Sequence, residues 1–544
     1  MTERPAHRPG SRRPSGTQTV RQWVRIWIAD LLGRSRGGYR EREDRPRRIR
    51  AQIFALLGIA ASLVYLGWAA TVLNTRMRWL SIPFLLGEAL GLVNFALFTM
   101  TTWHPRFHRP EGVGAKRVYS VDILVTTCGE PYAVVAETLR AAVAMAYPAK
   151  RVYLLDDAAS ADLRRLAEAL ECGYLARPVR HDAKAGNLNY ALSRTEGDLI
   201  LTVDADQVPD KALAATLVGY FDAPQMGFVA TKQAFELPPG DPFCNADVLF
   251  YDVMQPGKDR HNAAFSCGSG VMYRRKALED IGGFSTWNLV EDVHTSMLLH
   301  AAGWRSVYYE HALSRGTAPA DIWGVYHQRA QWATDGLRIL FWDNPFLRRG
   351  LSWAQRAEYT HVGLVYLFAG WVMPLFYLVP VVSLLSAQCV IVTDLWHYLL
   401  FRGPGFLLTS YATHYIHAAA PRGVSFLRAT GTWLGYAPAF QVATFVALFS
   451  PRQKPAYAVT EKVARVNSVT RRLLGTAPHW LVIAGVLIAI PLGWTNPRAD
   501  WNSVLINTLW AVNQVMILIW LVRAPWVVRR ASDGVEDRPA ADQR

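Results

Sequence analysis

The chain has 544 residues, of which 51% are hydrophobic and only 19% are charged, and its formal net charge is +15. This composition argues against a wholly soluble protein and predicts a soluble domain combined with membrane-spanning segments. Many of the basic residues crowd into an N-terminal arm that precedes a long apolar run, which is typical of the cytoplasmic flank of a span. We therefore expect contact with the lipid bilayer and no nucleic-acid partner. The five cysteines show no CxxC spacing, so neither a disulfide framework nor a zinc site is expected.

The N-terminal part is expected to lead into two membrane spans. Residues 1–19 should be disordered, and residues 20–50 should form an interfacial amphipathic helix and a basic linker, with a helix packed on the protein as the alternative. Residues 51–100 hold two apolar runs, and Glu88 in the second should face a neighbouring helix or a polar cavity. Two spans return the chain to the side of the arginine arm. Residues 105–350 should therefore be cytosolic, in a multi-pass protein of the plasma membrane.

Within residues 105–350, short β-branched runs alternate with helical stretches, which is the pattern of a mostly parallel α/β sheet. Such sheets bind ligands at the carboxyl ends of their strands. The predicted strands end in polar side chains at this edge, namely Thr127 and Glu130, Asp156 and Asp157, and Asp204 and Asp206. We therefore expect a binding site there.

Apolar segments return in residues 351–525, and residues 526–544 are expected to form a disordered tail. The segments are predicted spans at 359–385, 480–494 and 504–522, a weaker span at 395–416, and an interfacial helix at 424–449.

Asp204 and Asp206 are the candidate metal ligands. Two carboxylates one residue apart at a strand end can jointly hold a hard divalent cation and a diphosphate bound to it. An isolated pair of this kind is more often two solvated loop acids. The apolar strand that precedes the pair, and the acidic pair Asp156 and Asp157 one α/β unit earlier, favour the metal site.

Three further stretches carry candidate chemistry. Lys184 can supply a positive charge to a phosphate, although the same stretch could be the start of a surface helix. Asp292 begins a helical stretch, where the helix dipole keeps a carboxylate ionised as a general base, or where it simply caps the helix. Gln328, Arg329, Gln331 and Trp332 share one or two helical turns, in which the indole can stack on a sugar ring or anchor the chain at the membrane interface.

Taken together, these residues resemble the processive family 2 glycosyltransferases, most closely the catalytic subunit of bacterial cellulose synthase. The resemblance rests on ordered motifs at Asp156-Asp157, at Lys184, Gly186 and Asn187, at Asp204 and Asp206, at Phe265-Ser266-Cys267-Gly268-Ser269, at Val290-Glu291-Asp292, and at a gating-loop motif with Tyr457, Thr460 and Lys462 near residues 454–470. It implies a GT-A-like nucleotide-sugar transferase domain inserted between transmembrane helices.

The resemblance also implies roles for individual residues. Asp292 would be the catalytic base of an inverting reaction, Asp204 and Asp206 would hold Mg²⁺ or Mn²⁺, and Trp332 would stack the acceptor sugar at the mouth of a transmembrane channel. The residues implied to contact the UDP-sugar donor or the glycan are Thr127, Glu130, Asp156, Asp157, Lys184, Asp204, Cys267, Gly268, Ser269, Gln328, Arg329, Gln331, Trp332, Tyr457, Thr460 and Lys462.

The chain departs from the family pattern at Gln331, which stands where an arginine normally meets the diphosphate. Losing that charge-assisted contact should weaken donor binding by about 1.5–3 kcal/mol unless Arg329 or Lys462 compensates. The family's Gly and Tyr are replaced by Ala158 and Cys128. A C-terminal cyclic di-GMP-binding barrel is not expected, since the chain stops soon after the last predicted span.

Three functions therefore stay open at this point. The first is a processive β-glycan synthase that uses a UDP-sugar, with UDP-glucose as the first candidate, and that works with a membrane or periplasmic partner subunit. The second is a non-processive transferase that adds one sugar to a lipid or short glycan. The third, from another class, is a catalytically weak scaffold or transport protein, against which the intact Asp204, Asp206 and Asp292 argue.

Overall fold

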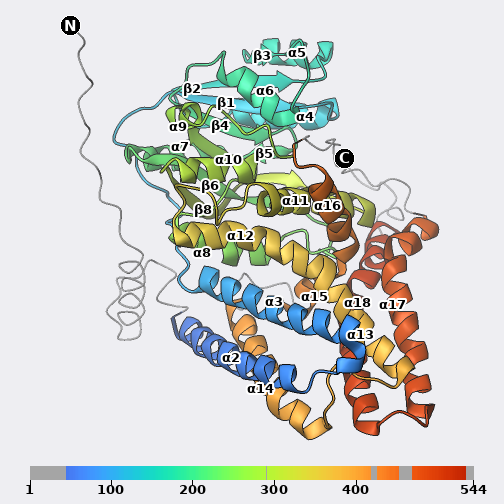
Figure 1. Cartoon of the computed structure of the whole chain (residues 1–544). Coiled ribbons are helices and arrows are strands. Elements are labelled where there is room, and N and C mark those ends of the chain that lie inside the picture. Colours follow the sequence, from blue (N-terminus) through green and yellow to red (C-terminus); the bar gives the residue numbers. More distant parts are fainter. Residues whose placement is uncertain (1–44, 290, 418–425, 453–467, 534–544) are drawn as a thin grey trace, which may run out of the picture.

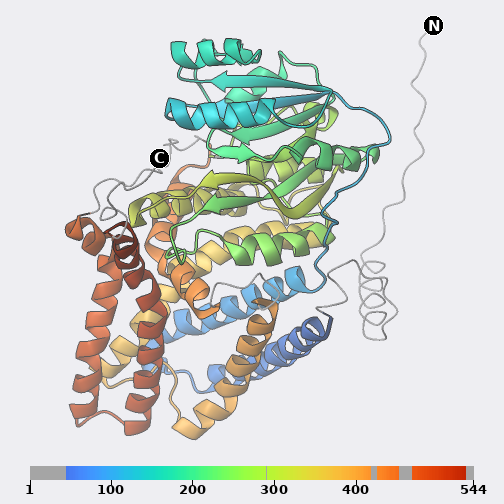
Figure 2. The ribbon, with the colours of Figure 1, turned by 180° about the vertical axis from the view of Figure 1, so that it is seen from behind.

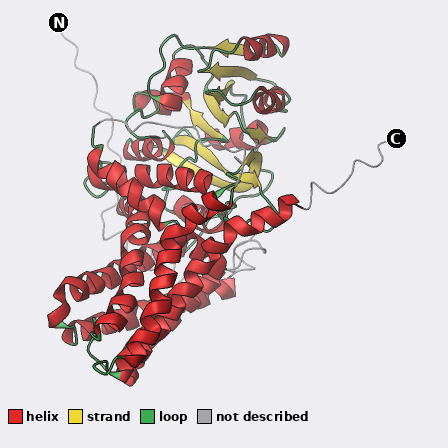
Figure 3. Ribbon diagram, turned by 90° about the vertical axis from the view of Figure 1, so that its right-hand side faces the viewer, coloured by secondary structure: helices red, strands yellow, loops and turns green. Residues whose placement is uncertain are grey.

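The computed structural model describes residues 45–289, 291–417, 426–452 and 468–533. A mixed eight-stranded sheet and its helices form one end of the molecule, and long helices form the other (Figures 1 and 3). The sheet has the order β3-β2-β1-β4-β7-β6-β8-β5. Its strands are β1 (Val121–Thr127), β2 (Lys150–Asp156), β3 (Gly173–Leu175), β4 (Leu199–Asp204), β5 (Gln207–Pro209), β6 (Met226–Glu236), β7 (Val271–Arg274) and β8 (Arg305–Thr317).

The sheet is parallel in one half and mixed in the other. The neighbours β3, β2, β1 and β4 pair in parallel, which confirms the α/β prediction, whereas β7 runs antiparallel to both β4 and β6. In the parallel half, Thr127 pairs with Asp156 and Thr126 pairs with Asp204. This register places three strand ends level with one another, so their polar side chains meet at one edge.

Apolar side chains alternate between the two faces of the central strands and build one core on each face. Along β1, Ile123 and Val125 belong to one core, and Leu124 belongs to the other. Helices α4, α5 and α7 cover the first face, and α6, α9 and α10 cover the second. The helices of this domain are α4 (Tyr132–Val143), α5 (Ala161–Ala169), α6 (Ala183–Leu192), α7 (Leu213–Val218), α8 (Gln255–Arg260), α9 (Arg275–Asp280), α10 (Asp292–Ala301) and α11 (Ile322–Trp342).

Five helical runs in the described residues are long and apolar enough to cross a membrane. They are α2 (Arg45–Thr71), Thr75–Thr102 with α3 (Arg78–Thr102), Trp353–Ser386, α17 (Val469–Thr495), and Trp501–Val527 within α18 (Trp501–Asp533). The predicted spans at 51–100, 359–385, 480–494 and 504–522 fall within these runs. Helices α15 (Phe426–Gly435) and α16 (Ala437–Phe449) cover the predicted interfacial helix, and they form a pair bent by 45° that is apolar enough for one broken span.

The predicted weaker span at 395–416 is one helix, α14 (Leu395–His417), which passes through Pro404 without a break and packs along α2 (Figures 1 and 2). It is not among the runs that are apolar enough to be candidate spans. Its Arg402 lies 3.1 Å from the Glu88 carboxylate of α3 and stacks over the Tyr65 ring of α2. Glu88 therefore faces a neighbouring helix, as a carboxylate within an apolar run requires.

One continuous helical run joins the sheet domain to the helical end. It comprises α12 (Trp353–Leu367), a π-helical turn (Phe368–Val372) and α13 (Met373–Ser386). The run begins at a capping box: the Gln355 backbone N–H donates to Ser352 Oγ (3.2 Å), and the Ser352 backbone N–H donates to the Gln355 side chain (2.9 Å). In Figure 1, α12 and α8 lie between the sheet domain and α3.

A fully buried ionic cluster holds these layers together. The Glu358 carboxylate of α12 accepts hydrogen bonds from Lys258 Nζ of α8 (2.8 Å) and from Thr101 Oγ1 of α3 (2.8 Å). The Nδ1 atom of His261 lies 2.7 Å from its second oxygen. The side chains of Lys258 and Glu358 are 1% and 0% exposed, so each charge depends on the other for its stability in the interior.

We predict that Glu358→Gln strongly destabilises the protein, because it leaves the Lys258 ammonium buried without a counter-charge. Loss of one partner of a buried pair costs about 3–5 kcal/mol. Thermal unfolding of the purified chain in detergent should show a clearly lower midpoint. Lys276→Met is the matched control, because it removes one partner of the exposed Lys276–Asp280 pair and should leave the midpoint almost unchanged. Equal midpoints for Glu358→Gln and the unaltered chain would contradict this account.

Candidate active site

The first two strand ends of the predicted site are held by internal hydrogen bonds. At the end of β1, Thr127 Oγ1 donates to the Glu130 carboxylate (2.6 Å), and the Cys128 backbone N–H donates to the same group (2.8 Å). At the end of β2, the buried Asp156 carboxylate accepts from the backbone N–H groups of Ala158 and Ser160, each at 2.8 Å. These two carboxylates therefore shape the loops after the strands.

Asp157 is also engaged within the protein. Its two oxygens accept from Arg177 Nε and Nη2, at 2.6 and 2.7 Å, in a bidentate pair. The same guanidinium donates to the backbone carbonyl of Ala183 (2.9 Å), at the start of α6. Asp157 thus acts through Arg177 to fix the position of the helix that carries Lys184.

Lys184 joins the third strand end to helix α10. Its ammonium lies 2.7 Å from Asp204 Oδ1, 3.0 Å from Glu291 Oε1 and 2.8 Å from the Gly268 carbonyl oxygen. Burial would lower the pKa of Lys184, but the carboxylates of Asp204 and Glu291 raise it above its ordinary value. The side chain is therefore a fixed cation among carboxylates.

The backbone and amides around this cation are also fixed. The Asp204 N–H donates to Ser269 Oγ (2.9 Å), and Ser269 is fully buried. Asn187 donates to the Leu155 carbonyl of β2 (3.3 Å), and Asn189 donates to the Phe284 carbonyl (2.8 Å). The side-chain amides of Asn187 and Asn189 therefore bind neighbouring backbone carbonyls. Of these three side chains, it is Lys184 that contacts the carboxylates of the site.

Asp292 is the first residue of α10 and lies beside this cluster. Its Oδ1 accepts from the Val293 backbone N–H (2.6 Å). Burial and the neighbouring Glu291 carboxylate raise the pKa of Asp292 to about 7. A carboxyl group with this pKa is suited to accept a proton near neutral pH. Asp292 also lines a cavity of about 490 Å³ that extends away from the strand edge.

Aromatic and membrane-helix side chains line the cavity. Trp332 of α11, Phe95 and Phe98 of α3, and Trp433 of α15 contribute to its wall. Cys267 also lines it, next to Gly268 and Ser269. The cavity therefore runs from Asp292 toward the helices that are apolar enough to span a membrane. Aromatic faces of this kind stack on sugar rings.

Arg329 does not face the strand edge. It pairs with Asp247, stacks over the Trp332 ring (4.7 Å) and lies 5.7 Å from the centre of the Tyr436 ring. Burial would lower the pKa of Arg329, but Asp247 raises it. Gln331, one turn from His327 on the same helix, donates its amide to His327 Nε2 (2.9 Å). Arg329 thus braces the cavity wall, and its compensation for Gln331 stays a prediction.

Asp206 lies in the turn between β4 and β5, two residues after Asp204. Among the described residues, no group of three or more His, Cys, Asp or Glu side chains forms a closed metal site. The carboxylate oxygens of Asp204 and Asp206 are of the kind that suits Mg²⁺ or Mn²⁺, which keep several waters and bind substrate phosphates. Gln328 lies on α11, whereas Tyr457, Thr460, Lys462 and Val290 lie outside the described residues.

Residues 120–334 match the family described as "Glycosyltransferase like family 2". This segment is a family 2 glycosyltransferase domain. Residues 279–402, which continue from the domain into α14, match the family described as "Cellulose synthase". The cellulose-synthase match thus begins inside the glycosyltransferase domain and extends through the α12–α13 run.

Curated relatives of the chain include bacterial cellulose synthases. Cellulose synthase 1 of Komagataeibacter xylinus is 36% identical over 60% of this chain and 22% of its own length. Putative cellulose synthase 2 of the same organism is 29% identical over 85% of this chain and 32% of its own. The UDP-forming cellulose synthase catalytic subunit of Pseudomonas fluorescens is 32% identical over 59% of this chain and 46% of its own. The alignments thus span less than half of each relative.

A solved structure that is similar to the chain is a mannosyltransferase from Pyrobaculum calidifontis in complex with GDP-Man and Mn²⁺. It is 19% identical and has a TM-score of 0.47, and the comparison covers 67% of this chain and 99% of that one.

In the candidate site, Gly268 lies against Lys184 and Asp292. Gly268 has φ +85°, and an added Cβ would lie 3.1 Å from Lys184 Nζ and 3.6 Å from Asp292 Oδ2. Sequence motifs marked Lys184 and Asp292, but no motif marked Asp247 or Arg177. Those two were missed because their partners are remote in the chain or have no family signature.

We predict that Gly268→Ala lowers the rate of sugar transfer by roughly tenfold to a hundredfold, because a small displacement of Lys184 or Asp292 disturbs the reacting geometry. Gly303→Ala is the matched control: Gly303 has φ +92°, and its added Cβ would meet nothing within 4 Å. Both variants carry the same left-handed strain of about 1 kcal/mol, so their unfolding midpoints should fall alike. Equal rates for the two variants would contradict the assignment.

Proposed function

We propose that this chain is a membrane-embedded inverting glycosyltransferase that transfers a sugar from a UDP-sugar, first of all UDP-glucose, onto a growing β-glycan and helps the polymer cross the membrane. One observation carries the proposal. Asp292, the base candidate, lies where the charged strand edge opens into an aromatic-lined cavity of about 490 Å³ that leads to the membrane helices. The cellulose synthases to which the chain is similar support the reaction class.

The charged strand edge suits a nucleotide-sugar donor. Lys184 provides a fixed positive charge for a phosphate, and Asp204 and Asp206 would hold a divalent cation beside it. When bound, Mg²⁺ or Mn²⁺ supplies the positive charge that stabilises the departing nucleoside diphosphate. Lys184 Nζ lies 2.7 Å from Asp204 Oδ1 and balances part of its charge.

The cavity suits the acceptor. Trp332 presents an aromatic face to a sugar ring, and the Arg329–Asp247 pair holds that indole in place. Asp292 then removes the proton from the acceptor hydroxyl as that oxygen attacks the anomeric carbon. The bond to the diphosphate breaks on the opposite face, so the configuration inverts and no covalent bond to the protein forms.

The distribution of arginines supports a cytosolic catalytic domain. Arg45, Arg47, Arg48 and Arg50 occupy four of the first six positions of α2, on the side of the sheet domain (Figure 1). Arginines at this end of a span keep it on the cytoplasmic side. We therefore place the donor site in the cytosol of a plasma-membrane protein.

The direct test uses the purified chain in nanodiscs with a panel of UDP- and GDP-sugars and Mn²⁺, with Asp292→Asn as the control. A high-molecular-weight product that requires a UDP-sugar and Asp292 supports the proposal. A single-sugar adduct favours the non-processive alternative, for which Gln331 in place of arginine leaves room. Turnover that does not depend on Asp292, or none at all, overturns the assignment. Digestion by linkage-specific hydrolases identifies the product.

The raised pKa of Asp292 predicts the pH dependence. The base works only when it is deprotonated, so kcat/KM should fall about tenfold per unit as pH drops below about 7. Glu291→Gln removes a like charge and should move this acid limb to lower pH. Lys184→Met removes a cation that lowers the pKa of Asp292 and should move the limb to higher pH. If the two variants moved the acid limb in the same direction, this result would contradict Asp292 as the titrating base.

We predict that Gln331→Arg lowers the KM for the donor. A new charge-assisted contact to the diphosphate strengthens binding by about 1.5–3 kcal/mol, which is roughly tenfold or more in affinity. Gln331→Met, which has no charge to offer, is the control and should give no gain. An unchanged or higher KM for Gln331→Arg would count against the placement of this side chain near the diphosphate.

A further inference from the structure

The base candidate and the acceptor platform lie on two different helices. Asp292 and Val293, at the start of α10, line the aromatic-lined cavity, and so do Trp332 and Asp335 of α11. The two helices are neighbours in the domain (Figure 1). In the proposed reaction, an acceptor hydroxyl must meet Asp292 while its sugar ring lies on Trp332. The start of α10 must therefore keep a fixed position relative to α11.

His294, two residues after Asp292, connects the two helices. Its Nε2 atom lies 2.9 Å from Oδ2 of Asp343, the C-cap residue of α11. Arg348 Nη1 lies 2.9 and 2.7 Å from the two Asp343 oxygens, so that carboxylate is ionised and can only accept a hydrogen bond. Burial lowers the pKa of His294, so the ring is neutral. Its one N–H is therefore on Nε2 and donates to Asp343.

Ser285 holds the other edge of this ring. Its Oγ donates to His294 Nδ1 (2.6 Å), and its backbone N–H donates to Thr295 Oγ1 of α10 (2.9 Å). The Trp287 ring packs on the imidazole with a distance of 4.7 Å between the ring centres. Ser285 and His294 are 8% and 6% exposed, so bulk water does not compete for these bonds. Both nitrogens of His294 are thus engaged, one toward the turn before α10 and one toward α11.

Two further contacts bind the turn before α10 to the same helix. The Leu289 backbone N–H donates to Asp335 Oδ1 (2.8 Å). Arg338 Nη1 donates to the Trp287 carbonyl (2.8 Å), and its guanidinium stacks over the Trp287 ring (4.5 Å). Asp335 and Arg338 are about one turn apart on α11, and Arg338 is fully buried. The turn and the helix start are therefore bound to α11 at three points, of which the imidazole contact comes from α10 itself.

We propose that His294 is a positioning residue that fixes Asp292 relative to Trp332. Its contact with Asp343 attaches the start of α10 to α11, as Lys184 attaches it to the strand edge. The link between the helices stands on these contacts alone, whereas its effect on sugar transfer rests on the proposed function.

Loss of the link should separate cleavage of the donor from sugar transfer. When the acceptor hydroxyl no longer meets Asp292, a water molecule can attack the anomeric carbon in its place. The water oxygen then forms the new bond, its proton passes to Asp292, and the bond to the diphosphate breaks. The products are UDP and free sugar, instead of UDP and a longer glycan.

The two ring nitrogens can be tested one at a time. In His294→Asn the amide lies near the place of Nδ1 and keeps a partner for Ser285, but it is too short to reach Asp343. In His294→Gln the amide extends to the place of Nε2 and keeps the bond to Asp343. His300→Asn is the matched control, because His300 lies on the same helix, is 1% exposed and has both ring nitrogens hydrogen-bonded.

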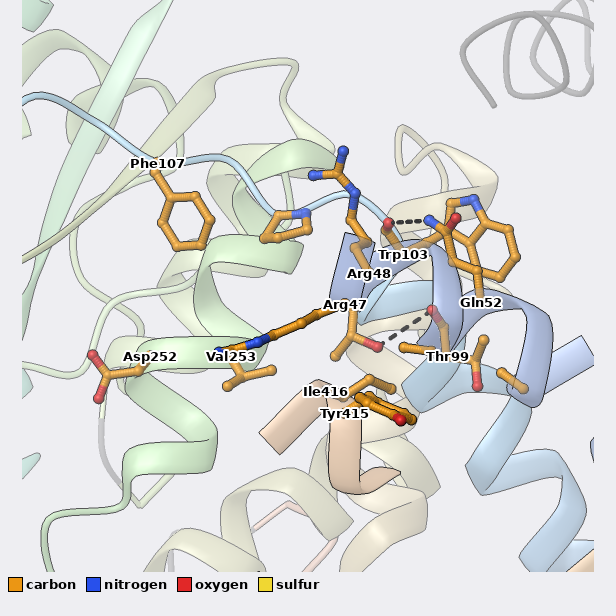
Figure 4. Close-up of a pocket in the computed structure, with 14 residues that line it drawn as sticks. Arg47, Arg48, Gln52, Thr99, Trp103, Phe107, Asp252, Val253, Tyr415 and Ile416 are labelled. Carbon is orange, nitrogen blue, oxygen red and sulfur yellow. Dashed lines mark hydrogen bonds between the residues drawn. The ribbon is translucent and has the colours of Figure 1, made fainter. Parts of the chain in front are cut away.

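A second control tests whether the loss of any buried hydrogen bond has the same effect. Gln52→Met removes a bond of 2.8 Å to the Trp103 carbonyl, at a pocket where α2 and α3 meet the domain (Figure 4). Gln52 is 7% exposed, about as buried as His294. The described residues that line this pocket include none from α10 or α11, so the link between those helices stays intact.

Two measurements are made on the full chain in nanodiscs. Deuterium exchange of the backbone amides in residues 285–296 reports how firmly the start of α10 is held, and it needs no substrate. The ratio of UDP released to sugar transferred from UDP-glucose reports whether donor cleavage and transfer stay coupled. Partial unfolding does not change this ratio, because an unfolded chain does neither.

We expect His294→Asn to speed exchange in residues 285–296, to lower sugar transfer roughly tenfold to a hundredfold, and to raise the ratio of UDP to transferred sugar. His294→Gln should stay close to the unaltered chain, and both controls should keep its ratio even where their unfolding midpoints fall. An unchanged ratio in His294→Asn, or equal effects of the Asn and Gln variants, overturns the proposal. If the unaltered chain transfers no sugar, the proposed function fails, and the exchange measurement alone then decides the link between the helices.

Discussion

The site depends on one partly buried cation among carboxylates. Asp204, Glu291 and Asp292 come from β4 and the start of α10, and their negative charges repel one another at short range. Lys184 balances two of them, at 2.7 and 3.0 Å, and also binds the Gly268 carbonyl. Three chain segments therefore converge on one ammonium group. Burial, together with the neighbouring Glu291 carboxylate, raises the pKa of Asp292, while the carboxylates of Asp204 and Glu291 raise the pKa of Lys184 and keep it charged.

The buried Glu358 carboxylate holds the layers of the fold together, as Lys184 holds together the charged groups of the site. Glu358 holds α8 of the domain and α3 of the helical end to α12. The aromatic cavity takes its walls from these same layers, since Phe98 belongs to α3 and Asp292 belongs to the domain. A domain that shifted on its helices would open that cavity. The position of the base relative to the cavity thus depends on a charge pair remote from the reaction.

The sequence predicts the strand-edge site because strand ends, carboxylates and Lys184 are local features. The α/β alternation placed Thr127, Asp156 and Asp204 on consecutive parallel strands, and the strand register aligns them. Side-chain pairs between residues that are distant in the sequence could not be predicted. The pairing of Arg329 with Asp247, 82 positions earlier, could not be predicted because Asp247 belongs to no motif. The pairing of Asp157 with Arg177 also needs three-dimensional proximity, and a donor contact of Asp157 stays a prediction. The gating-loop motif lies outside the described residues.

The π-helical turn between α12 and α13 has a consequence for how the two halves of that run are oriented. An α-helix rotates by about 100° per residue, so the wider turn at Phe368–Val372 offsets the faces on either side of it. The half that carries Glu358 faces the glycosyltransferase domain, and the half after Met373 packs on α17 and α18. Removing one residue from the turn would swing one half relative to the other, although no contacting side chain had changed. The turn therefore sets the relative rotation of the two halves, so that each half packs against its own neighbours within one helical run.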